Sequence, residues 1–318
     1  MATANIETTH APDATPDKAK WLEGLSYAQH QRLRFFEAKL LWEGQINRQS
    51  VCLQFGVTAN HFTREVRDYR HYFPNNLWYD VSDRVYRPTE KFQAGVATGQ
   101  PNEYLALLKI YTHNPSNALL AEMGTTVECE IFAEPQGQVD QNVFRLLLAA
   151  IHCQSGCQVM YQSFSSATAQ KRTIWPHALA WSGERWHVRA YDSKRHTYLD
   201  FALPRITSAS AEKSSLPDNA DEDKDWLETL NIEVIPNPKL SASQQRVIAN
   251  EYGMKRKSNG YVWSTTLRRC MIPYFLYRYR LDDLQNTKQT HNLPIPRIIV
   301  RDYTIIKKYS FTSKNYNL

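Results

Sequence analysis

The stretch that most constrains the fold of this 318-residue chain is Trp186–Tyr191, which reads Trp-His-Val-Arg-Ala-Tyr and follows Arg185. Its Trp, Val and Ala alternate with its His, Arg and Tyr. Alternation with a period of two gives a strand with one apolar and one polar face. With Arg185, the polar face carries two guanidinium groups, an imidazole and a phenol, which is more recognition chemistry than a solvated surface needs. The pattern predicts a strand whose polar face binds a ligand.

Short strands are expected on both sides of this stretch. Val159–Ser163 and Thr173–His177 precede it, and Tyr198–Ile206 follows it. Ser-Gly-Glu and Asp-Ser-Lys turns separate the strands, which is typical of a small antiparallel barrel. An amphipathic helix leads into the barrel, with its apolar positions at Val143, Leu146, Leu147, Ala150 and Ile151.

The N-terminal part is helical from Ser26 onward. Leu33, Phe36 and Leu40 recur at helical spacing, and Gly44 supplies a stop. A second, short helix at 48–55 is capped by Asn47 and followed by a glycine turn. Thr58 is a good cap for a third helix, which we expect to run to about residue 71.

This third helix has two distinct faces. Phe62, Val66 and Tyr69 form an apolar stripe, and hydrogen-bonding side chains form the opposite one. Leu77–Asp80 and Arg84–Arg87 then read as a hairpin. Three helices followed by a hairpin predict a winged helix-turn-helix, in which Asn and Arg side chains contact base edges. A solvated helix face is the alternative interpretation. The candidate DNA-binding residues are Asn60, His61, Thr63, Arg64, Arg67, His71, Arg84 and Arg87.

The remaining segments are less distinctive. Between the winged helix and the barrel, Tyr104–Tyr111 and Ala118–Glu122 look helical and Val127–Phe132 resembles a strand, in a connector broken by prolines, the first of them Pro101. Residues 208–224 combine low hydrophobicity with clustered charge, which indicates an exposed linker.

A third, α+β module is expected from about residue 226. Leu230–Val234 alternates as a strand, Ser241 caps a helix, and further strands are expected at Tyr261–Trp263 and Arg297–Val300. The segment Tyr274–Arg280 mixes aromatic and basic residues, as single-strand-binding surfaces do. Packing of alternating aromatic residues on a partly buried element explains it as well, and we prefer that interpretation.

Composition narrows the possible classes of protein. The net charge is +6, and residues 225–318 carry 15 Lys and Arg against 7 Asp and Glu, which is consistent with a polyanionic partner. The first 20 residues lack an apolar core and predict a disordered tail, and we expect a cytoplasmic protein without a membrane span.

The five cysteines form no disulfide framework. Zinc at Cys153, Cys157 and His152 is the less favoured alternative to free thiols, because a second ligand pair is lacking. Neither metal nor cofactor is expected.

Three segments resemble the WYL family, which has a small Sm/SH3-like barrel. They are Trp175-Pro-His-Ala-Leu, Arg185-Trp-His-Val-Arg-Ala-Tyr-Asp and Phe201-Ala-Leu-Pro-Arg-Ile. The name-giving Trp-Tyr-Leu is replaced here by Trp186-His187-Val188. The variant resembles the BrxR/CapW branch of transcriptional repressors beside bacterial phage-defence operons, such as BREX, and the order of the domains is similar.

The resemblance implies a homodimer that binds an inverted repeat of double-stranded DNA and a barrel that senses a nucleotide or a nucleic-acid fragment. The ligand pocket of the family maps onto Tyr161, Ser163, Arg172, His177, Trp186, His187, Arg189 and Arg205. Arg195 is a further candidate, for which a solvent-facing side chain is the alternative. Because the family's Tyr is replaced, the identity of the ligand stays open.

We therefore expect a multidomain α+β fold with an N-terminal winged helix-turn-helix, a central Sm/SH3-like WYL β-barrel and a C-terminal α+β dimerisation module. The expected ranges are 1–24 for the tail, 25–95 for the winged helix, 96–134 for a helical connector, 135–210 for the WYL domain, 211–225 for an acidic linker and 226–318 for the dimerisation domain.

Two other functions stay open at this point. A WYL-type activator would have the same sequence features, because the sign of regulation depends on where the operator lies. A nucleic-acid-processing enzyme would need clustered carboxylates or a nucleophile with a base. Ser163, His177 and Asp192 are the candidate triad for it, but nothing in the sequence places them together, and we expect no enzyme.

Overall fold

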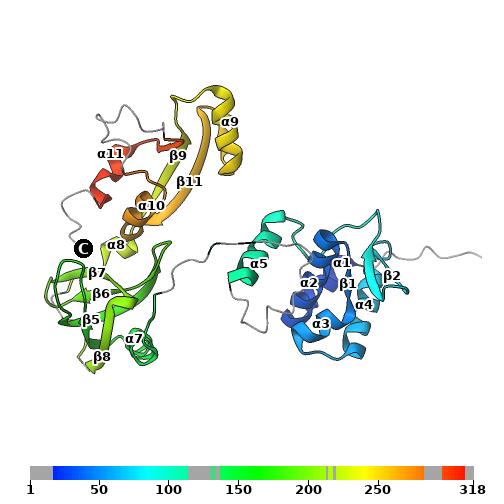
Figure 1. Ribbon diagram of the computed structural model, residues 1–318, viewed down its shortest axis with the longest axis horizontal. Helices are drawn as coiled ribbons and strands as arrows, with labels where there is room; N and C mark the ends of the chain where they lie inside the picture. Colours follow the sequence, from blue (N-terminus) through cyan, green and yellow to red (C-terminus); the bar gives the residue numbers. More distant parts are fainter. Residues whose placement is uncertain are drawn as a thin grey trace, which may run out of the picture. The chain divides into compact units, whose positions relative to one another are not determined.

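The computed structural model describes residues 17–113, 130, 132, 137–212, 214–217, 220–282 and 296–311. The chain divides into two compact units, Met1–Ala133 and Glu134–Leu318, and each is described by itself (Figure 1). No helix in the described ranges is long and apolar enough to cross a membrane.

The first unit is a bundle of helices beside a small sheet (Figure 1). Its three strands form an antiparallel sheet in the order β1-β3-β2. Its helices are α1 (Lys18–Glu23), α2 (Tyr27–Glu43), α3 (Arg48–Phe55), α4 (Ala59–Tyr72) and α5 (Pro101–His113). Its strands are β1 (Ile46–Asn47), β2 (Leu77–Asp80) and β3 (Val85–Pro88).

Local capping signals set the helix ends of this unit. Ser26 forms a capping box with Gln29 at the start of α2, and Asn47 and Thr58 cap α3 and α4. α2 ends at Gly44, which has a φ of 71°, and α3 ends at Gly56, with a φ of 63°. Glycine adopts this left-handed conformation without a Cβ clash. These capping predictions and the hairpin that follows α4 are confirmed; the pairing of β1 with β3 was not anticipated.

Aromatic side chains dominate the core of the first unit. Phe36, Phe62 and Tyr69 are fully buried and meet edge to face. The buried carboxylate of Glu37 on α2 accepts hydrogen bonds from the Tyr69 hydroxyl and from the backbone N–H groups of residues 95–97. These bonds fix the segment that follows the wing to the helical core.

One expectation for this unit needs correction. Residues 18–23 were assigned to a disordered tail, but they form α1, because Trp21 stacks on Tyr72 at 4.7 Å. The helix expected at Tyr104–Tyr111 is confirmed as part of α5, which begins at Pro101, where the missing N–H costs no hydrogen bond. The expected helix Ala118–Glu122 lies outside the described residues, and the expected strand Val127–Phe132 lies almost entirely outside them.

The second unit contains two sheets. The first is antiparallel, with α7 (Gln141–Cys153) packed on it, and has the order β7-β6-β5-β4-β8. Its strands are β4 (Gly156–Tyr161), β5 (Gln170–Trp181), β6 (Trp186–Asp192), β7 (Thr197–Ala202) and β8 (Ile206–Glu212), with the 3₁₀ turn η1 (Leu203–Arg205) before β8. The strands predicted at Val159–Ser163, Thr173–His177 and Trp186–Tyr191 are confirmed as β4, β5 and β6. The single strand predicted at Tyr198–Ile206 is wrong, because β7 ends at Ala202 and η1 separates it from β8.

The strand β8 corrects the linker prediction. Residues 208–212 were placed in an exposed linker because they are small, polar and charged. They belong instead to an edge strand that pairs with β4, from Gly156 opposite Glu212 onward. An edge strand with an open face tolerates such residues, so composition alone does not distinguish it from a loop.

The second sheet has the order β10-β11-β9-β12 and builds the C-terminal α+β module. Its strands are β9 (Thr229–Pro236), β10 (Lys255–Lys257), β11 (Gly260–Arg268) and β12 (Ile298–Val300). Its helices are α8 (Lys224–Leu227), α9 (Ala242–Glu251), α10 (Ile272–Arg278) and α11 (Tyr303–Ile306), with 3₁₀ turns η2 (Arg269–Met271) and η3 (Lys307–Tyr309). The strands predicted around 230–234, 261–263 and 297–300 and the Ser241 cap are confirmed.

Candidate DNA-reading surface and effector pocket

The helix α4 presents its polar face to solvent. Phe62, Val66 and Tyr69 are buried, and the expected DNA-binding positions Asn60, Arg64, Arg67 and His71 are exposed. Within the described residues Arg64 has no ion-pair partner, and Arg67 has only a long contact of 3.4 Å to Asp68 beside it. Cationic side chains on one exposed helix face are therefore available to a polyanion.

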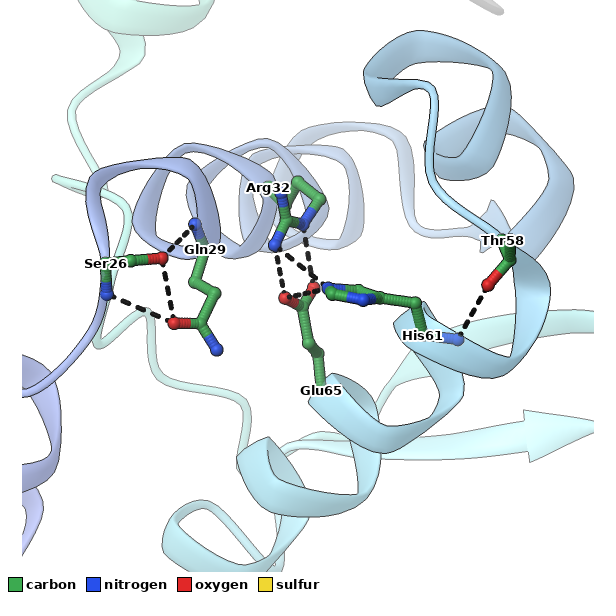
Figure 2. A network of polar contacts seen from close by, with 6 residues as sticks. All are labelled: Ser26, Gln29, Arg32, Thr58, His61 and Glu65. Carbon is green, nitrogen blue, oxygen red and sulfur yellow. Dashed lines mark hydrogen bonds and ion pairs between the residues drawn. The ribbon is translucent and has the colours of Figure 1, made fainter.

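A network of charges holds the start of α4 against α2 (Figure 2). The guanidinium of Arg32 donates from Nε to Glu65 Oε2 at 2.9 Å and from Nη2 to Glu65 Oε1 at 2.5 Å. Both side chains are buried. The Nε2 atom of His61 lies 3.1 Å from Glu65 Oε1 and 3.2 Å from Arg32 Nη2. The network positions the helix and one of its candidate DNA-binding side chains together.

The wing residues differ in what they have available for DNA. Arg84 lies in the turn between β2 and β3, is exposed and has a φ of 56°. Arg87 donates to Asp80 at 2.9 Å and also to Asp83, so its guanidinium stabilises the hairpin itself. The hydrogen bond from Arg87 holds the pKa of Asp80 below its usual value. Of the two arginines, Arg84 is the better placed to reach a phosphate.

A cavity of about 800 Å³ lies between the five-stranded sheet and the C-terminal module. Six of the nine predicted ligand-binding residues line it: Tyr161, Ser163, Arg172, Arg189, Arg195 and Arg205. The C-terminal module contributes Tyr274 and Tyr309, together with Lys308. The volume suits a small organic ligand of nucleotide size.

Arg189 is the most constrained cation in this cavity. Its side chain is buried and donates to Asp223 from Nε at 2.6 Å and from Nη2 at 2.7 Å, and to Asp200 from Nη1 at 3.0 Å. Burial by itself disfavours the charge, but the hydrogen bonds and charges of these two carboxylates raise the pKa of Arg189. The Tyr274 hydroxyl of α10 donates to Asp200 at 3.1 Å. Asp200 thus joins the sheet to the C-terminal module.

The other arginines of the cavity are held less tightly. Arg172 donates to the buried Asp192 at 2.7 Å, and its Nε has no hydrogen-bond partner in the described structure. Arg195 and Arg205 have no ion-pair partner among the described residues. These two arginines are the cations most available to an anionic ligand.

The remaining three predicted ligand-binding residues do not line the cavity. His177 Nε2 lies 2.9 Å from Asp223 Oδ2, and Trp186 is half exposed and packs on Trp181. His187 is buried against Tyr274, and burial lowers its pKa. The polar face of β6 is therefore largely enclosed, which the alternation of residues did not reveal.

Asp223 is the residue of this site whose role was least predictable from the sequence. It was assigned to an exposed acidic linker, but it is buried and receives hydrogen bonds from Arg189 and from the backbone N–H of Trp226. Desolvation would raise the pKa of Asp223, but His177 and Arg189 lower it to about 2. Its only signal in the sequence is its position as a cap before α8.

The described residues proposed for a catalytic triad or a zinc site do not come together in the structure. Ser163 bonds to neighbouring serines, His177 contacts Asp223, and Asp192 contacts Arg172 instead of forming a triad. Cys153 is exposed and Cys157 is buried, and both are free thiols. Among the described residues, no three His, Cys, Asp or Glu side chains are grouped so that they could hold a metal ion.

Three family models match the chain in order. They are described as the BrxR transcriptional regulator winged helix-turn-helix domain at residues 28–110, the WYL domain at 142–211 and the BrxR transcriptional regulator C-terminal dimerization domain at 229–304. Together they match the elements described above, and the first includes α5, whose Glu103 forms an ion pair with Arg34 of α2.

Similar curated proteins carry the description DNA-binding transcriptional repressor CapW. The protein from Pseudomonas aeruginosa is 31% identical over 267 residues, covering 84% of this chain and 88% of the relative. The protein from Escherichia coli (strain KTE188) is 32% identical over 272 residues, covering 85% and 89%. The protein from Stenotrophomonas maltophilia is 27% identical over 258 residues, covering 81% and 85%. The chain therefore belongs to the CapW family of WYL-domain regulators.

Proposed function

We propose that this protein is a homodimeric, sequence-specific DNA-binding repressor of a phage-defence operon. It binds an inverted-repeat operator in the cytoplasm through its winged helix, and the C-terminal module joins the two protomers. The single observation that carries the proposal is the exposed face of α4, where Asn60, Arg64 and Arg67 lie opposite a fully packed core stripe. The CapW descriptions of the relatives and the dimerization model support it.

The division of roles on DNA follows from the chemistry of the side chains. Arg64, Arg67 and Asn60 are suited to base edges in the major groove, because Arg and Asn make paired hydrogen bonds with guanine and adenine. Arg84 on the wing is suited to a phosphate or to the minor groove. Phosphate contacts supply much of the affinity and make it salt-dependent, and base contacts supply specificity.

Replacing Arg64 and Arg67 together by Ala tests this assignment. We expect the double variant to lose sequence-specific binding by at least about 10-fold, since each good base contact contributes about 1–3 kcal/mol of discrimination. Gel-shift titration would use a duplex that the wild-type protein selects from a random library. The matched control is Glu23→Ala on α1, an exposed change on the same unit. Unchanged affinity of the double variant, with the dimer intact, would overturn the role of α4.

The second part of the proposal concerns regulation by a nucleotide or nucleic-acid ligand in the cavity. Arg195 and Arg205 contribute guanidinium groups that have no ion-pair partner among the described residues, and their planar geometry fits phosphate oxygens. Tyr161, Phe201 and Tyr274 line the same space and offer aromatic surface to a base. To regulate, the ligand must bind one state of the dimer better than another.

Calorimetric titration with a short phosphorylated deoxyoligonucleotide tests the ligand class. We expect Arg205→Ala and Arg195→Ala each to weaken binding about 10-fold, as loss of a charge-assisted hydrogen bond does. Lys255→Ala, a surface change on the β10 hairpin, serves as the control. Equal affinity of all the variants would place the ligand outside this cavity.

An activator is the second candidate, because binding the same operator in another position relative to the promoter would raise transcription. We propose no catalytic role, since the residues that the enzyme hypothesis needs are engaged elsewhere.

A further inference from the structure

His61 occupies an unusual position for a side chain on a candidate DNA-reading helix. It lies in the first turn of α4, one residue after Asn60, and its backbone N–H donates to the Thr58 cap at 3.3 Å. Its side chain is 51% exposed, whereas the Arg32 and Glu65 side chains that contact it are 8% and 5% exposed (Figure 2). The imidazole therefore connects a buried ion pair to the surface.

The two buried partners of His61 favour opposite protonation states of its Nε2 atom. The Glu65 carboxylate 3.1 Å from Nε2 is an acceptor and favours a proton on that nitrogen. The Arg32 Nη2 group at 3.2 Å is a donor and favours a lone pair there. Arg32 and Glu65 are themselves joined by two hydrogen bonds. Of the three side-chain types, histidine is the one whose charge ordinarily changes between about pH 5 and 8.

Bound DNA would favour the protonated state of His61, because it adds a second anion on the exposed side of the ring. The N-terminal residues of a recognition helix are the ones that contact DNA, and a helix N-terminus favours anions. Among the described residues, Nδ1 of His61 has no hydrogen-bond partner, and the charged groups within hydrogen-bond distance of the ring are Arg32 on α2 and Glu65 on α4. With both nitrogens protonated, His61 donates from Nε2 to Glu65 and from Nδ1 to a phosphate or a base acceptor.

We propose that His61 couples DNA binding to the uptake of one proton, and that Arg32 and Glu65 are positioning residues for its ring. The proposal rests on the proposed DNA-reading role of α4 and adds to it a pH-dependent contact. The proton comes from the solvent and moves onto the imidazole, and no other bond changes. DNA affinity then falls as the pH rises and His61 loses the proton that DNA stabilises.

The test is the dissociation constant for the selected duplex, measured by fluorescence anisotropy from about pH 5.5 to about pH 8.5 at fixed ionic strength, a range that brackets the ordinary pKa of histidine. For the wild type we expect log Kd to rise with pH with a slope of at most about one per pH unit, as linkage to one proton requires. His61→Gln should bind with a nearly flat profile. Glu65→Gln should reduce the slope, because the acceptor that stabilises the imidazolium loses its charge.

His152→Gln is the matched control, because His152 is an exposed histidine on α7, in the second unit and outside the residues proposed to contact DNA. It should keep the wild-type slope. Thermal melting of every variant separates loss of folding from loss of coupling, and His61→Gln, at a half-exposed position, carries the test if Glu65→Gln unfolds. A flat wild-type profile, or a wild-type slope in His61→Gln, would overturn the proton coupling. Failure of the wild type to bind any duplex would instead overturn the DNA-reading role itself.

Discussion

At the scale of single residues, the second unit depends on a buried arginine. The Arg189 guanidinium is satisfied by Asp223 and Asp200 together, and Asp223 also contacts His177. Removing one partner of a buried pair is costly, because the other charge stays buried without compensation. The network therefore stabilises the contact between the sheet and the segment that leads into the C-terminal module.

We expect Asp223→Ala to lower the free energy of unfolding by about 3–5 kcal/mol, the usual cost of breaking a buried ion pair. Urea unfolding at neutral pH would measure the loss. Glu222→Ala, at the exposed neighbouring position, should change stability by less than about 0.5 kcal/mol. Equal stabilities of the two variants would show that Asp223 is not a structural anchor.

The stability contributed by the contacts of Asp223 depends on pH in a defined way. The pKa of Asp223 is lowered from its ordinary 3.8 to about 2, so its stabilising contribution is complete above pH 3.8 and is lost as the pH falls towards 2. The stability difference between the wild type and Asp223→Asn should therefore narrow in this range. A stability difference between the two proteins that stays constant from pH 3.8 down to about pH 2 would contradict the lowered pKa of Asp223.

At the scale of elements, the helices with clear capping signals were predictable from the sequence, whereas α1 and the edge strand β8 were not. Ser26, Asn47 and Thr58 cap their helices through local hydrogen bonds, and Gly44 and Gly56 end helices through their own conformations. Such signals lie within a few residues of the element that they define. Strand β8 depends instead on pairing with β4, which lies about fifty residues earlier in the chain. Its composition therefore resembled that of a linker.

The two candidate sites also differ in how far they could be predicted from the sequence. The exposed face of α4 followed from helical spacing, because Phe62, Val66 and Tyr69 fix which side is buried. The cavity was only partly predictable, because Tyr274, Lys308 and Tyr309 come from a module distant in sequence. His177 and His187 were chosen from their alternation and family position, yet packing directs them to Asp223 and Tyr274. Periodicity assigns a face, and the tertiary fold decides what covers it.

At the scale of the whole molecule, each domain has a separate task in the proposed function. The winged helix binds DNA and the C-terminal module pairs protomers. We propose that the cavity between the five-stranded sheet and that module binds the effector. Tyr274 lines this cavity and donates to Asp200 of the sheet, so an occupant of the cavity contacts both parts of the second unit. This arrangement gives ligand binding a direct physical route to the dimerisation module.

The central claim is repression through the exposed face of α4, and a reporter gene placed behind the selected operator tests it most directly. Expression of the wild-type protein should lower reporter output at least about 10-fold relative to Arg64→Ala/Arg67→Ala, the variant that lacks the base-reading contacts. Both proteins must accumulate equally and form dimers, as immunoblotting and sedimentation would establish. Higher output with the wild type would identify an activator, and equal output with the two proteins would contradict the account.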